Sequence, residues 1–152
     1  PTTSPAGAPL VLDPVADAVA RARRHVRRAL READAAESST SAELAVSELV
    51  TNAVLHARTP LTVAVRAAPA GRVRVEVADA SPVPLRVRRL GAAATTGRGL
   101  RVVEALSSEW GVDPLPAGRG KTVWFVPRPG ADGPGLDAGA WAAELEGLEG
   151  LS

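Results

Sequence analysis

The chain has 152 residues, 45% of them hydrophobic, and a formal net charge of only +1 at pH 7. This length suits a single hydrophobic core, and a nearly neutral chain has no global electrostatic attraction to nucleic acid. The absence of cysteine excludes disulfides and thiolate metal sites and fits a cytoplasmic protein. No apolar run is long enough to span a membrane, so we expect no membrane insertion. Because the net charge is close to zero, we also expect no direct nucleic-acid binding.

Residues 1–12 are small or apolar and carry no charge, so we expect a flexible leader or an edge strand. Asp13 and Pro14 are typical of an N-cap and a first helical position. The apolar residues that follow at helical spacing are Val15, Val19, Ala22, Val26 and Leu30. The opposite surface carries the arginines Arg21, Arg24, Arg28 and Arg31. This stripe indicates a solvated face or a contact with an acidic protein partner.

A second helix is predicted after the sequence 40–43, Thr-Ser-Ala-Glu, which is typical of a capping box. On this helix Glu48, Asn52 and His56 are four residues apart, so they share one polar stripe beside an apolar surface. The amide oxygen of Asn52 suits Mg²⁺, and Glu48 can take a proton from a hydroxyl group or water. We interpret His56 as closing the helix end. The segment alone leaves open an amphipathic helix with ordinary polar residues.

Two strands are predicted next, over 61–67 and 73–79, with a turn over 68–71 between them. Strict alternation places Asp79 at the end of the second strand, just before a Ser-Pro turn. A carboxylate in that place can accept a hydrogen bond from an exocyclic amine and so select adenine. The alternative is a simple turn carboxylate.

A glycine-rich segment follows and opens a helix that extends to residue 106. It consists of Thr96, Gly97, Arg98, Gly99 and Leu100. Its glycines let the backbone approach a phosphate closely, and the free N–H groups of a helix start bind anions. The hydrophobic residues in the preceding segment 81–96 follow neither helical nor strand spacing. This segment is therefore either a mobile lid or an ordinary surface loop.

The last strands are expected over 108–112 and 122–126. Thr122 lies near the entrance of the final strand, where its hydroxyl can reach a phosphate or simply pack. We expect Trp110 and Trp124 in the core. Beyond residue 127 the chain becomes linker-like and then acidic, and its end is either a disordered tail or a docked helix.

Taken in order, these segments resemble the GHKL ATPase superfamily, and within it the anti-sigma factor serine/threonine kinases (RsbW-like proteins). The resemblance runs from about Val11 to Pro127 and rests on a set of boxes in the right order. Glu48 and Asn52 match the N-box, Asp79 the G1 box, Gly97 and Gly99 the G2 box, and Thr122 the terminal strand. The fold implied is α+β, a two-layer α/β sandwich of the Bergerat type whose mixed, largely antiparallel sheet carries helices on one face.

The resemblance implies a histidine-kinase-like ATPase domain over 13–127, preceded by the leader and followed by a linker and acidic tail over 128–152. It implies ATP and Mg²⁺ as cofactors, Glu48 as the catalytic residue and Asn52 as the metal ligand. The nucleotide-binding residues implied are Asn52, Asp79, Thr96, Gly97, Arg98, Gly99, Leu100 and Thr122. The implied activity is phosphorylation of a serine or threonine on an anti-anti-sigma (STAS-type) partner, together with sequestration of a sigma factor. Homodimerisation stays open.

One departure from the family pattern concerns the G1 box, which usually continues from its aspartate with two glycines. Here residues 80–84 read Ala-Ser-Pro-Val-Pro, and the prolines make this turn stiffer. A nucleotide-dependent binding switch without phosphotransfer is therefore an alternative. A histidine kinase catalytic domain is a third alternative, but the chain shows no helix pair that bears a phosphoacceptor histidine.

Overall fold

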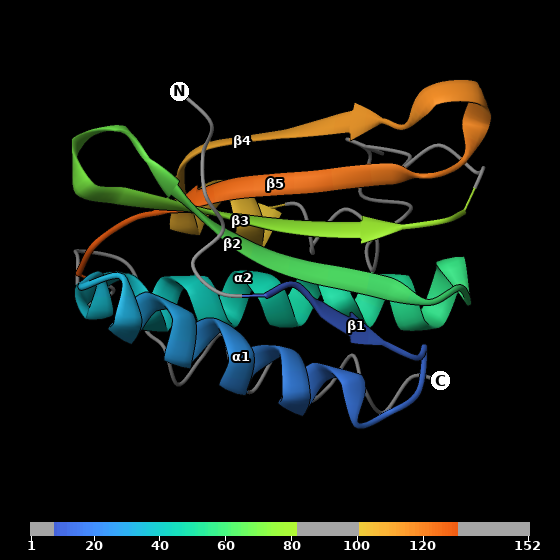
Figure 1. Ribbon diagram of the computed structural model, residues 1–152, viewed down its shortest axis with the longest axis horizontal. Helices are drawn as coiled ribbons and strands as arrows, with labels where there is room; N and C mark the ends of the chain where they lie inside the picture. The colour runs from blue at the N-terminus through green and yellow to red at the C-terminus, as the bar shows by residue number, and fades with distance from the viewer. Residues whose placement is uncertain (1–7, 82–100, 131–152) are drawn as a thin grey trace.

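The computed structural model describes residues 8–81 and 101–130. These residues form a five-stranded sheet with two long helices against one of its faces (Figure 1). The strand order is β1-β2-β3-β5-β4, and every neighbouring pair among these strands is antiparallel. The predicted α+β fold in two layers is confirmed.

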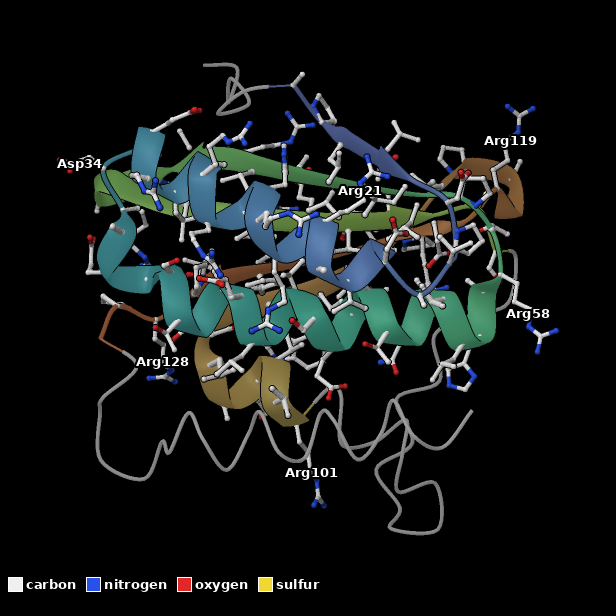
Figure 2. The ribbon with its side chains drawn as sticks, turned by 90° about the horizontal axis from the view of Figure 1, so that it is seen from below. Arg21, Asp34, Arg58, Arg101, Arg119 and Arg128 are labelled. Carbon is white, nitrogen blue, oxygen red and sulfur yellow. The ribbon has the colours of Figure 1, made fainter. Side chains whose placement is uncertain are left out.

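The sheet contains β1 (Leu10–Leu12), β2 (Leu61–Ala68), β3 (Arg72–Asp79), β4 (Ser107–Pro114) and β5 (Lys121–Pro127). The long helices are α1 (Ala18–Glu32) and α2 (Ser39–Asn52). The short turns of helix are η1 (Ala36–Ser38), η2 (Ala53–Ala57), η3 (Pro69–Gly71) and η5 (Pro116–Gly118). Residues 101–106 are also helical and lie beside α2 in the view from the helical side (Figure 2).

The core lies between the sheet and the helices. Strand residues alternate between the two faces, and β-branched valines suit such a half-buried surface. The register aligns Val63 with Val77 and Val77 with Val123, and all three are buried. Val26 of α1 and Val50 of α2, both fully buried, belong to the same core. Strands β2 and β3 and the helix faces are therefore where the hydrophobic periodicity predicted them.

The start of the first helix differs from the prediction, because α1 begins at Ala18 rather than at Pro14. The residues between them form a turn in which the Val15 N–H donates to the Asp13 carbonyl at 2.8 Å. Val15 is consequently 51% exposed and lies outside the helix. The predicted edge strand in the leader does form, as β1, which pairs with β2.

The second helix also begins differently from the predicted capping box. Helix α2 starts at Ser39, whose hydroxyl donates to Glu43 Oε2 at 2.8 Å. At the other end α2 passes into the π-helix η2, and the Arg58 N–H donates to the Ala53 carbonyl at 3.0 Å. This wider turn rotates the residues after Asn52 off the regular helical stripe. His56 is exposed in the last turn.

The two tryptophans among the described residues lie on opposite faces of the sheet. Trp110 pairs with Phe125 and packs against the core, as predicted. Trp124 was predicted in the core, and this is wrong, because its ring lies on the other face over Gly111 and under the Arg74 guanidinium, 4.0 Å from the ring centroid. None of the helices in the described part of the chain has the length and apolar character needed to cross a bilayer.

Candidate functional site

Asp79 lies at the end of β3, as its sequence position predicted, and faces the helical layer. Its direct neighbour on β5 is Lys121, and the two side chains form an ion pair. The Lys121 ammonium lies 3.1 Å from both carboxylate oxygens. The residues are only 8% and 9% exposed. The Ser81 N–H adds a hydrogen bond to Asp79 Oδ1 at 2.9 Å, so the carboxylate is firmly oriented.

Gly120 allows β5 to approach the end of β3 this closely. Its φ is +130°, and a Cβ built on it would lie 2.0 Å from the Asp79 carbonyl oxygen. Only glycine fits a position with a positive φ and a backbone at that distance. The turn before β5 thereby brings Lys121 against Asp79.

The C-terminal end of α2 reaches the same end of the sheet (Figure 1). Helix α2 packs against β3 and β5. The segment after η2 is tied to the end of β3 by a hydrogen bond from the Ala80 N–H to Thr59 Oγ1 at 3.1 Å. Arg58, after η2, and Arg119, in the turn before β5, mark this end in the view from the helical side (Figure 2). The predicted N-box helix and the predicted G1 strand therefore meet.

Glu48 and Asn52 occupy the inner part and the end of α2. Glu48 is 1% exposed, so a carboxylate lies at the boundary of the hydrophobic core. The Asn52 Nδ2 atom is buried and has no hydrogen-bond partner among the described residues. Because rotation about the last side-chain bond exchanges the amide nitrogen and oxygen, this end of Asn52 can present either a donor or an acceptor.

The chemistry of Asn52 fits a bound Mg²⁺ that also takes water and phosphate oxygens. An amide oxygen is a hard ligand of the kind that Mg²⁺ accepts, and this ion keeps several waters instead of a full protein cage. The described residues contain no group of three or more histidine, cysteine or acidic side chains that could hold a metal ion. A site made of Asn52, water and phosphate oxygens needs no such group.

Thr122 lies on the opposite face of the sheet from Asp79. It pairs with Ala78 and Asp113, whereas Asp79 pairs with Lys121. From β5 it is therefore Lys121 that shares a face with Asp79, and sequence reasoning missed this residue. The alternation of β3 and the buried pattern of β5 were the signals that could have identified it, since two antiparallel strand ends of opposite charge can pair.

The predicted phosphate-binding residues Thr96, Gly97, Arg98, Gly99 and Leu100 lie outside the described residues, as does most of the segment interpreted as a lid. The helical residues that follow them are well anchored, because Val102, Val103 and Leu106 are buried in the core. Arg101 points away from the body of the protein (Figure 2).

Comparison with protein families decides the assignment. The sequence model of the histidine kinase-like ATPase domain matches residues 12–126, about three quarters of the 152 residues. The chain belongs to the histidine kinase-like ATPase domain family. No curated protein matches it. Membership of this family supports nucleotide binding by the chain.

Proposed function

We propose that this histidine kinase-like ATPase domain is an anti-sigma regulatory kinase. In this proposal it uses ATP to phosphorylate a serine or threonine of an anti-anti-sigma (STAS-type) partner and sequesters a sigma factor. The observation that supports it best is that α2, which carries Glu48 and ends at Asn52, meets the end of β3, which carries Asp79. A proton acceptor, a cation ligand and a base-recognising carboxylate then serve one nucleotide.

Each of these residues has a role in the proposal. Asp79 accepts from the base, Asn52 holds Mg²⁺ against the phosphates, and Glu48 takes the proton of the incoming hydroxyl group. A Mg²⁺ ion held by Asn52 would supply positive charge against the phosphate oxygens. Glu48 is 1% exposed, so little bulk water reaches its carboxylate. The glycine-rich segment 96–100 binds the phosphates in this proposal.

The partners are proteins and not nucleic acid in this proposal. The outer surface of α1 carries exposed arginines that suit an acidic protein surface, namely Arg21, Arg24, Arg28 and Arg31. A regulator of sigma factors works beside RNA polymerase, so the proposed location is the cytoplasm. Homodimerisation is compatible with the proposal and is not required by it.

A second candidate function is a nucleotide-dependent binding switch without phosphotransfer. The ion pair supports it, because the carboxylate assigned to the base already has Lys121 as a partner. The stiff sequence after Asp79 supports it as well.

Phosphate transfer from radiolabelled ATP to a STAS-type partner separates the two functions. For the kinase we expect Glu48→Gln to keep its affinity for ATP while transfer falls by roughly 10² or more, the usual effect of a general base. Glu43→Gln is the matched control, since Glu43 is on the same helix but pairs with Arg27 at 2.6 Å. Wild-type protein that binds ATP tightly, labels no partner and behaves like Glu48→Gln would favour the binding switch.

A further inference from the structure

The ion pair places a hydrogen-bond donor beside the carboxylate that recognises the base. Lys121 is the only lysine of the chain, and its ammonium lies 3.1 Å from Asp79. An aspartate alone can only accept hydrogen bonds. It would attract the exocyclic amine of adenine and repel the O6 atom of guanine. With Lys121 adjacent, this end of the sheet carries both an acceptor and a donor.

The bonding capacity of the pair is incompletely used by the described residues. Asp79 Oδ1 receives the Ser81 N–H and the ammonium, whereas Oδ2 has the ammonium alone. A carboxylate has about four lone-pair sites and an ammonium has three N–H donors. The contacts of Lys121 to the described residues are both with Asp79. Among the described residues, one acceptor direction on Oδ2 and one N–H of Nζ therefore have no partner, and these two atoms lie 3.1 Å apart.

The edges of the purines decide what such a pair accepts. Adenine presents its 6-amino donor next to the N1 acceptor, and a 6-oxopurine presents its O6 acceptor next to the N1–H donor. A neighbouring donor and acceptor complement both edges, in opposite order. The charge of the pair is also balanced, so the O6 atom of a 6-oxopurine meets no uncompensated anion.

We propose that Lys121 determines base specificity and that the site accepts 6-oxopurine nucleotides as well as ATP. The inference rests on the proposed nucleotide binding at Asp79. The sequence alone leads us to expect that Asp79 selects adenine. With Lys121 beside it, we expect the pair to accept both kinds of purine. Lys121 acts by donating to O6 in a 6-oxopurine and to N1 in adenine.

The test is the affinity for ATP, GTP, ITP and inorganic triphosphate, measured by calorimetry with Mg²⁺. We expect wild-type protein to bind GTP and ITP within about tenfold of ATP, and triphosphate alone more weakly. Lys121→Met should weaken the binding of both nucleotides. It should also raise the ratio of the ITP and ATP dissociation constants by about ten- to a hundredfold, because Asp79 without its partner still accepts from the adenine amine but repels O6. Arg119→Met is the matched control, because Arg119 is exposed in the turn before β5 and its loss should leave the ratio unchanged.

A measurement on wild-type protein covers the case in which Lys121→Met does not fold. Because the chain has one lysine, labelling with ¹³C,¹⁵N-lysine yields signals from Lys121 alone. We expect ATP and ITP to shift its Cε signal, each in a different direction or extent, and triphosphate to leave it nearly unchanged. Strong ATP binding with GTP and ITP more than about a hundredfold weaker, and an unmoved lysine signal, would overturn the inference and leave the proposed function intact. Failure of all nucleotides to bind would overturn both.

Discussion

Replacing Gly120 by alanine tests whether the turn before β5 sets the contact between Asp79 and Lys121. The added Cβ would lie 2.0 Å from the Asp79 carbonyl oxygen and 2.8 Å from the Ala80 Cα, both backbone atoms. No side-chain rotation relieves these contacts, so β5 and the end of β3 must separate. The φ of +130° is also one that residues with a Cβ rarely adopt.

The size of the effect follows from these two contributions. A residue held in a sparsely populated backbone region costs about 1–3 kcal/mol, and overpacking a well-packed site costs about 1–3 kcal/mol. We therefore expect Gly120→Ala to lower the free energy of unfolding by roughly 2–6 kcal/mol. That is a large fraction of the ~5–15 kcal/mol of a typical domain.

Gly118→Ala is the matched control in the same turn. Gly118 has a φ of +67°, and a Cβ there would have no atom within 4 Å. For this variant the free energy of unfolding should fall only by the cost of placing alanine in a left-handed backbone conformation, about 1–2 kcal/mol. Urea unfolding, followed by circular dichroism, measures the free energy of unfolding of both variants. The comparison requires that the dependence of this free energy on urea concentration is the same in both. Equal losses in the two variants would refute the argument that a close backbone approach holds Lys121 against Asp79.

The remaining predictions concern the ion pair, the cation ligand and a titrating side chain. Lys121→Met should cost about 3–5 kcal/mol of stability because it leaves the Asp79 charge buried and unpaired, and adding Asp79→Asn should recover part of this loss; strictly additive losses in urea unfolding would argue against the pair. Asn52→Ala should abolish the Mg²⁺ dependence of ATP affinity in calorimetry, and equal wild-type affinity with and without Mg²⁺ would remove its metal role. Burial is the main cause that lowers the pKa of the His25 imidazole from its ordinary 6.5. The positive charge of Arg28 lowers this pKa further, and the negative charge of Glu32 partly opposes the shift. The unfolded chain then binds this proton more readily, so stability should fall as the pH drops through 6.5 and below, where the unfolded imidazole becomes charged. His25→Gln should remove that part of the pH dependence, whereas His56→Gln, which changes the exposed second histidine, should keep it; identical pH profiles for the two variants would contradict the assignment.

The elements with strong periodicity could be predicted from the sequence. Strands β2 and β3 alternate regularly and lie where that pattern placed them. The apolar stripe of α1 is also in place from Ala22 to Leu30. The local signals failed at the start of both helices, where the pattern is weak. A turn hydrogen bond from the Val15 N–H to the Asp13 carbonyl replaces the expected cap of α1, and the hydroxyl of Ser39 bonds to Glu43 at the start of α2.

For the candidate site, the sequence by itself determined which residue types were present and in what order, and this was enough to indicate Glu48, Asn52 and Asp79. Only the tertiary structure decided which residue of β5 stands beside Asp79, because a register shift of one residue exchanges the faces of a strand. The register pairs Asp79 with Lys121 and turns Thr122 to the other face. The physical reason lies in Gly120, since its missing side chain lets two distant strand ends approach closely enough to bury opposite charges together.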